Sequence, residues 1–270
     1  MPFVERPGYR IHYQSHGREG APPLLLVMGL AMGSDAWESL PAALAERFHV
    51  LALDNRGVGR STLGKGQFRI RDLADDAAAV LDAARVGPAS VFGISMGGMI
   101  SQQLAIRHPE RVRSLVLGAT FGSHRRSHKP SPLVAKDLFL VAVLARRGPA
   151  MARLLVSDEF LAANRERFDR WMKGLGRADR TVARRQILAI ALHEAEAELQ
   201  SLRIPTLLLS GDRDRLVPVE NSRRLARIIP RARLVELPGA GHAFPFERPR
   251  ETVRAVTEHC LGAIDSRGEA

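Results

Sequence analysis

Gly93-Ile94-Ser95-Met96-Gly97 is the stretch of sequence that decides the fold. An apolar run, Ala89–Ile94, leads into it, and a segment with helical periodicity, Gly97–His108, leads out of it. A strand that turns so abruptly into a helix strains the residue at the turn, and side chains two positions before and after it would collide. The pattern therefore predicts that the Ser95 hydroxyl is exposed at the carboxyl edge of a sheet. An ordinary glycine-rich turn is the alternative, and it leaves the flanking strand and helix unexplained.

Short apolar runs alternate with longer amphipathic segments on both sides of this turn. The runs are nearly continuous in Leu, Val and Ile, which is typical of strands buried on both faces of a parallel sheet. Their alternation with helices predicts an α/β fold with an open, mostly parallel sheet covered on both faces. Tyr9–Ser15 alternates in polarity instead and predicts antiparallel strands at one edge. The predicted strands are Pro23–Gly29, His49–Asp54, Ala89–Ser95, Val112–Ala119, Pro205–Gly211 and Ala232–Leu237, and the predicted helices are Ser34–Arg47, Ile70–Arg85, Gly97–His108, Pro218–Ile229 and Phe246–Cys260.

The segment between about Phe121 and Leu202 interrupts this rhythm. It has helical periodicity and no strand signal, and its basic side chains outnumber its acidic ones. We therefore expect residues 1–120 and 203–270 to form one α/β core and residues 121–202 to form a helical cap inserted between two core strands.

Length and composition agree with a globular α/β protein. The chain has 270 residues, of which 45% are hydrophobic and 26% charged, so a sizeable core is possible. The net charge of +11 raises the question of nucleic acid. No long basic block, zinc-finger spacing or aromatic-basic pattern accompanies it, so we expect solvated helix faces and no nucleic-acid partner. Attraction of acidic substrates is the alternative interpretation.

Cysteine, histidine and hydropathy patterns exclude several other classes. Cys260 is the one cysteine, so an internal disulfide is impossible. His124 and His128 are four residues apart but have no evident third ligand, so we expect no metal and no cofactor. The sequence has no uninterrupted apolar stretch of about 18 residues and no leader-like N-terminus, so we expect a cytoplasmic protein that does not enter a membrane.

A serine nucleophile needs a base and an acid that orients the base. Among nine histidines, only His242 lies in a short glycine-rich turn after the last predicted strand, at the sheet edge expected for Ser95. The acid is expected in the loop after the preceding strand, which offers Asp212 and Asp214. Asp214 is the preferred candidate because it lies further into the loop, whereas Asp212 is expected to bind backbone N–H groups there.

The remaining site residues follow from the same two-step acyl chemistry. The backbone N–H groups of Leu30 and Met96 are expected to form an oxyanion hole for a tetrahedral intermediate. Asp54–Ser61 lacks the full phosphate-binding pattern and is interpreted as a structural turn in which Asp54 pairs with Arg56. The residues expected to line the substrate pocket are Gly29, Phe121, Val217 and Phe244.

In combination, Gly93–Gly98, Asp54–Ser61, the Asp214 loop and Gly241-His242 resemble the α/β-hydrolase superfamily, in its capped, esterase-like branch. The resemblance covers 9–121 and 203–261 and implies a mostly parallel eight-stranded sheet with a helical cap over the site. Two departures matter. The usual histidine before the oxyanion glycine is Met28 here, which leaves the bonding within that loop open. A serine at the nucleophile position argues against the epoxide-hydrolase and dehalogenase members.

These features predict an enzyme that hydrolyses a small carboxylic ester or lactone through an acyl-enzyme on Ser95. Two alternatives use the same fold differently. The first keeps the triad and acts as a C–C bond hydrolase or a cofactor-free perhydrolase. The second is a catalytically silent ligand-binding protein. The sequence leaves the oligomeric state open.

Overall fold

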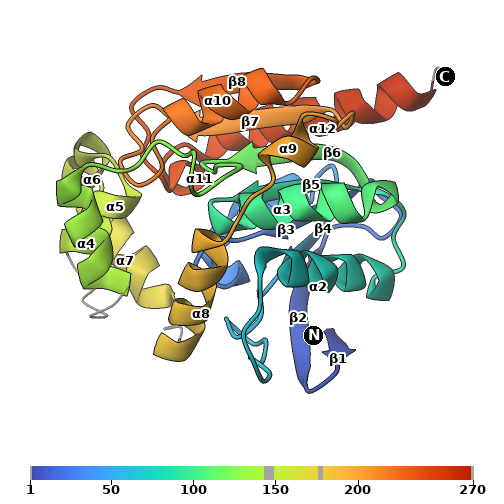
Figure 1. Ribbon diagram of the computed structural model, residues 1–270. Helices are drawn as coiled ribbons and strands as arrows, with labels where there is room; N and C mark the ends of the chain where they lie inside the picture. Colours follow the sequence, from blue (N-terminus) through green and yellow to red (C-terminus); the bar gives the residue numbers. More distant parts are fainter. Residues whose placement is uncertain (1, 143–148, 176–178, 269–270) are drawn as a thin grey trace.

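A single sheet organises the computed structural model, which describes residues 2–142, 149–175 and 179–268. The strands are β1 (Phe3–Arg6), β2 (Tyr9–His16), β3 (Pro23–Val27), β4 (His49–Leu53), β5 (Ala89–Ile94), β6 (Val112–Gly118), β7 (Thr206–Gly211) and β8 (Ala232–Leu237). Their order is β1-β2-β4-β3-β5-β6-β7-β8 (Figure 1). The pairs β1–β2 and β2–β4 are antiparallel, and all pairs from β4 to β8 are parallel. The predicted eight-stranded, mostly parallel α/β sheet is thereby confirmed.

Helices cover both faces of this sheet, and the strand sequences explain why. In β3, Leu25 and Val27 belong to one hydrophobic cluster, whereas Leu24 and Leu26 belong to the cluster on the opposite face. Successive side chains of a strand point to opposite faces, so a strand covered on both sides must be apolar throughout. The first cluster includes residues of α2 (Ile70–Ala83), α3 (Met96–Arg107) and α10 (Glu220–Ile228), and the second includes residues of α1 (Leu40–Leu44) and α12 (Pro249–Gly268).

Two predicted helices are each divided in the structure. The expected helix Ser34–Arg47 is a 3₁₀ turn, η1 (Ser34–Trp37), followed by α1, because Glu38 adopts a positive φ of 53° between them. The expected helix Phe246–Cys260 is α11 (Phe244–Glu247) followed by α12, which begins at Pro249. Proline has no N–H to donate to the preceding turn, so a new helix begins there.

The described residues between β6 and β7 form helices and one isolated bridge, Ser123 with Glu194. Figure 1 shows α4 to α7 gathered beyond one end of the sheet, with α8 extending back toward the core. A third hydrophobic cluster joins α5, α6 and α7 to the core, where Trp171 stacks on Phe246 with ring centroids 4.3 Å apart. The helices are α4 (Pro132–Ala142), α5 (Pro149–Leu155), α6 (Asp158–Ala163), α7 (Arg165–Gly174), α8 (Arg180–Ala191) and α9 (Glu196–Leu199).

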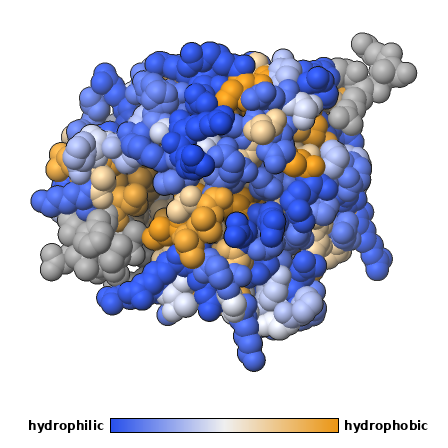
Figure 2. All heavy atoms as spheres, viewed as in Figure 1, coloured by the Kyte–Doolittle hydropathy of each residue, from blue (hydrophilic) through white to orange (hydrophobic). Residues whose placement is uncertain are grey.

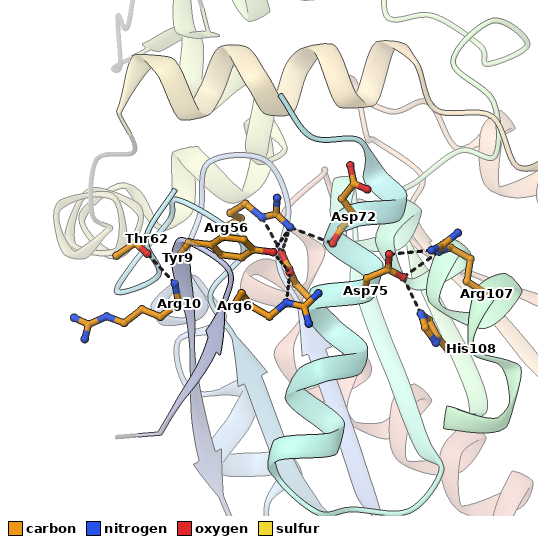
Figure 3. A network of polar contacts seen from close by, with 10 residues as sticks. Arg6, Tyr9, Arg10, Arg56, Thr62, Asp72, Asp75, Arg107 and His108 are labelled. Carbon is orange, nitrogen blue, oxygen red and sulfur yellow. Dashed lines mark hydrogen bonds and ion pairs between the residues drawn. The ribbon is translucent and has the colours of Figure 1, made fainter. Parts of the chain in front are cut away.

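The predicted pairing of Asp54 with Arg56 is wrong. Asp54 is fully buried, and one of its oxygens lies 2.9 Å from Nδ1 of His12. Arg56 instead donates to Asp76 of α2 over 2.7 Å and lies above the ring of Tyr9 (Figure 3). Burial raises the pKa of Asp76, so that carboxylate depends on a nearby cation, while Asp54 is already held by backbone N–H donors.

The face shown in Figure 2 is mainly hydrophilic, with an apolar patch near its middle, where Figure 1 places α8. Leu188 of α8 and Leu192, which follows that helix, are among the exposed large hydrophobic residues. Across the described residues, none of the helices combines the length and the hydropathy needed to cross a bilayer.

Candidate active site

Ser95 lies at the turn between β5 and α3, with φ 58° and ψ −120°. This left-handed backbone conformation is costly for a residue with a side chain, so neighbouring bonds must hold it. The N–H of Ser95 donates to the carbonyl of Gly118 over 2.8 Å, which extends the pairing of β5 with β6 by one residue. Its carbonyl accepts from the Thr120 hydroxyl at 2.8 Å. The strain is therefore supported from β6 and the residues that follow it.

Glycines around Ser95 make the turn possible. A side chain at Gly93 would overlap the backbone of Gly97, and one at Gly97 would overlap the carbonyl of Val27. At Gly29, on the adjacent loop, a Cβ would lie 3.1 Å from Cβ of Ser95 and 3.6 Å from its Oγ. Gly29 therefore allows the loop after β3 to approach the serine closely.

His242 and Asp214 form a buried pair. Nδ1 of His242 lies 2.8 Å from Oδ2 of Asp214, and both residues are 6% exposed. Because a carboxylate only accepts, Nδ1 carries the proton, and the lone pair remains on Nε2. The other oxygen of Asp214 accepts from the N–H groups of Leu216 and Val217 at 2.9 and 2.8 Å, which fixes the carboxylate.

Asp212 has a different partner. Its Oδ1 accepts from the N–H of Gly239 over 2.7 Å, in the turn after β8. The structure thus brings Asp214 to the imidazole and leaves Asp212 as a ligand for backbone, which is the arrangement that we expected for these two acids.

Glu247, which sequence reasoning missed, supports the His242 loop. Its carboxylate accepts from the N–H of Gly241 at 2.7 Å and from the hydroxyl of Ser157 at 2.8 Å. Burial raises the pKa of this carboxyl. The N–H of Ala243 also donates to the carbonyl of Leu155 over 2.6 Å. Both residues beside His242 are therefore tied to the inserted helices.

Ser95 and His242 line one cavity of about 650 Å³ between the core and the inserted helices. Leu30 also lines this cavity, whereas Met96 is fully buried and is not among the lining residues. Within the described residues, the N–H groups of Leu30 and Met96 donate to no protein acceptor. Of the residues expected to line the pocket, three do so: Gly29, Phe121 and Val217.

Phe244 is the exception among the expected pocket residues. It is fully buried in the hydrophobic core, where its ring stacks on Phe92 at a centroid distance of 6.5 Å. Phe244 begins α11, and the turn of that helix directs it into the core while Ala243, Pro245 and Phe246 line the cavity. The assignment of Phe244 to the pocket was therefore wrong.

The loop after β3 is held at three points. Asn55 donates to the carbonyl of Met28 at 2.8 Å, and the N–H of Ser34 donates to Asp54 at 2.6 Å. Between these points, the N–H of Ala31 donates over 2.8 Å to Oε1 of Gln186, on α8. Sequence reasoning missed Gln186 as well, since it sits in an unremarkable stretch of the inserted helices.

Basic side chains share the cavity with these groups. Besides His242, the titratable residues that line it are His124, His128, Lys129 and Arg180, and the described lining residues include no acid. The ammonium group of Lys129 donates to the Ser127 hydroxyl at 2.9 Å and to the carbonyl of His124, both neutral acceptors. Desolvation lowers the pKa of Lys129, and desolvation together with the Lys129 charge lowers that of His124.

The chemistry available to this arrangement is acyl transfer. An imidazole with its Nδ1 proton on a carboxylate can accept a proton at Nε2, and a serine hydroxyl in the same cavity can supply one. In the parts of the chain that the structure describes, no three His, Cys, Asp or Glu side chains cluster as a metal site.

Comparisons with known proteins agree with this geometry. The family model described as alpha/beta hydrolase fold matches residues 22–160 and 170–249. A protein from Azorhizobium caulinodans that bears the name of a carbamate hydrolase, RutD, is 33% identical over 98% of this chain and 100% of its own length. The enol-lactonase from Burkholderia xenovorans LB400 superposes with a TM-score of 0.84 at 26% identity, covering 96% of this chain and 99% of that one. An esterase from Thermogutta terrifontis gives 0.80 at 25% identity, covering 94% of each chain.

Proposed function

The chain belongs to the α/β-hydrolase fold family, and on this premise we propose that it hydrolyses a small carboxylic ester or lactone with Ser95, His242 and Asp214 as its catalytic triad. One observation carries the proposal. His242 is hydrogen-bonded to the buried carboxylate of Asp214, which two backbone N–H groups hold in place, and it lines the same cavity as Ser95, which has a positive φ. The strained turn and the buried charge both destabilise the fold, so a loop without a function would not be expected to combine them.

The proposed reaction has two steps. Oγ of Ser95 attacks the substrate carbonyl while Nε2 of His242 takes the hydroxyl proton. The tetrahedral oxyanion receives hydrogen bonds from the N–H groups of Leu30 and Met96. The intermediate collapses to an acyl-enzyme, and His242 returns the proton to the leaving alcohol. Water then attacks the acyl group with the same base, which releases the acid and restores the serine.

Esters and lactones are the preferred substrates because most of the cavity wall is apolar, as an acyl chain requires. The solved enol-lactonase and esterase support this class. A carbamate is the second candidate, and the RutD relative favours it. The same serine would attack its carbonyl, so the triad does not distinguish the two. Cleavage of a C–C bond and perhydrolysis remain alternatives for the same machinery.

The charge of the cavity favours a substrate that carries an anionic group remote from the scissile bond. Lys129 and Arg180 line the cavity from two separate segments, and neither forms an ion pair within the described residues. Desolvation lowers the pKa of Lys129, and an anion beside its ammonium group would stabilise the charge that desolvation disfavours. Arg180 would add an exposed charge of the same sign. A carboxylate on the acid or alcohol part of the substrate would supply that anion.

Covalent labelling tests the proposal. A fluorophosphonate should add one phosphonyl group to the wild-type protein, on the peptide that contains Ser95, and should leave Ser95→Ala unlabelled. Turnover of p-nitrophenyl acetate should fall by about 10³-fold or more in that variant, since a nucleophile is lost. Labelling of another residue would reject the nucleophile assignment. Slow or absent turnover by a labelled wild type would instead favour the ligand-binding alternative.

A further inference from the structure

The loop that carries Leu30 is shaped by groups outside it. Met28 has no polar side chain, so it can form hydrogen bonds only through its backbone, and Asn55 donates to its carbonyl. Ala31 adopts a φ of 59°, a conformation that is costly for alanine. The N–H of Leu30 has no protein acceptor within the described residues, and its direction depends on how Leu30 and Ala31 are held. The bond from Ala31 to Gln186 is the hydrogen bond that ties this part of the loop to α8.

Gln186 lowers the stability of the fold at that position. Its side chain is fully buried, and its Nε2 atom has no hydrogen-bond partner among the described residues. Only its oxygen can accept from an N–H, so the orientation that bonds Ala31 leaves the NH₂ group unpaired. A buried donor without an acceptor destabilises the folded state, because it has lost its hydrogen bonds to water. Methionine has a similar size and would remove the unpaired donor, while water in the cavity that Ala31 lines would accept from the freed N–H of Ala31, so stability alone does not account for the amide.

The helix that carries Gln186 also forms part of the cavity wall. Ala183 and Ile190, three residues before it and four after it, both line the cavity. Residues with these spacings share one face of a helix. Gln186 therefore lies on the face of α8 that borders the site, and Ala31, its partner 155 residues away in sequence, lines the same cavity.

We propose that Gln186 is a positioning residue for the reaction: by binding the N–H of Ala31, it holds the loop so that the N–H of Leu30 is directed at the developing oxyanion. The inserted helices would then complete the machinery of the core as well as covering it. The inference rests on the proposed acyl chemistry for its kinetic consequence, while the hydrogen bond and its effect on the loop stand apart from that chemistry.

Two matched substitutions test this role. Gln186→Met removes the acceptor and the unpaired donor at nearly constant volume. Gln67→Met is the control, because Gln67 also bonds α8, donating to the carbonyl of Arg185 over 3.0 Å, but is exposed and does not line the cavity. Both variants thus lose one hydrogen bond to the same helix at adjacent residues, and only one of them loses the contact with Ala31.

Kinetics and amide hydrogen exchange are measured together. In Gln186→Met, kcat on p-nitrophenyl acetate should fall about 10- to 100-fold, since a displaced oxyanion donor loses part of the 10²–10³-fold that a deleted one costs. KM should change by less than about threefold, because the donor acts mainly in the transition state. Exchange in residues 28–34 should accelerate, and the melting temperature should hold or rise. Gln67→Met should keep wild-type kcat and wild-type exchange in that loop.

Each outcome has one meaning. Unchanged exchange in residues 28–34 of Gln186→Met would overturn the positioning role, and so would a kcat loss of equal size in Gln67→Met. Faster exchange without any change in kcat would also overturn it, because the loop would then be held for no catalytic purpose. Failure of the proposed function is separate from these results, since it would appear as a wild-type protein whose Ser95 is not labelled by fluorophosphonate.

Discussion

At the scale of single residues, the two aspartates of the loop after β7 have different hydrogen-bond partners and therefore different roles. Asp214 points inward. One of its oxygens accepts from two backbone N–H groups, and the other accepts from His242. Asp212 turns to Gly239. A buried carboxylate that is fully hydrogen-bonded can hold an imidazole in one tautomer and stabilise its cation, whereas an acid on a remote backbone amide does neither.

Asp214→Asn should therefore lower kcat by about 10³- to 10⁴-fold on p-nitrophenyl acetate, because the amide would present its NH₂ to Nδ1 and reverse the tautomer. Asp212→Asn is the matched control. It keeps an oxygen for the N–H of Gly239, so its kcat should stay within about threefold of wild type. Steady-state kinetics on both variants, with circular dichroism to check folding, decides between them. The opposite ranking would assign the catalytic role to Asp212.

The catalytic candidates were predictable from sequence because each follows a predicted strand of a parallel sheet, and such strands end at one edge. The placement of Phe244 was not predictable, because a shift of one position along a short helix decides whether a side chain faces the cavity or the core. Gln186 and Glu247 were not either. Their partners, Ala31 and Ser157, lie 155 and 90 residues away, and no periodicity in the chain records such contacts.

At the scale of elements, the sequence predicts strands better than helix ends. Burial on both faces leaves a nearly continuous apolar run, which β3 to β7 display, and their bounds agree with prediction to within two residues. The break at Glu38 carries no such mark, because a positive φ at a glutamate reflects the packing of η1 and α1 against the core rather than local preference. The docking of α8 on the core is equally hidden in the sequence.

His193, which follows α8, makes that docking sensitive to pH. It is 4% exposed, with Nε2 3.1 Å from Oε1 of Gln102 on α3, and burial lowers its pKa from 6.5 to about 4. The folded protein therefore keeps this histidine neutral where the unfolded chain protonates it. Stability is complete above the unfolded value and declines as pH falls from 6.5 toward 4.

The unfolding free energy should fall by roughly 2 kcal/mol between pH 7 and pH 5 through His193 alone. His193→Gln should be less stable at pH 7, because its amide fits the imidazole site imperfectly, but its decline toward pH 5 should be shallower by about that amount. Urea unfolding at the two pH values measures both quantities. Equal declines in the variant and the wild type would show that this histidine is not the group that titrates.

At the scale of the whole molecule, charge acts on a substrate in two ways: through the field of the net charge and through the cations that line the cavity. The net charge of +11 gives the surroundings of any ligand a positive field, to which all surface cations contribute. Lys129 and Arg180 differ from most of the surface cations because they line the cavity that contains Ser95. A specific effect on substrate choice must come from that placement, and matched substitutions can separate it from the general field.

Lys129→Met and Arg180→Met should each raise KM for a carboxylate-bearing p-nitrophenyl ester about threefold to fivefold, and leave KM for the acetate ester within about twofold, as expected for loss of one exposed ion pair. Lys136→Met and Arg184→Met are the controls. Both residues are exposed and do not line the cavity, and Arg184 lies on the same helix as Arg180. All four variants lower the net charge equally, so the general field changes alike in each. Equal increases in KM across the four variants would assign the effect to that field. If KM for an octanoate ester rises as much as KM for the acidic ester, the two side chains shape the cavity and do not bind an anion.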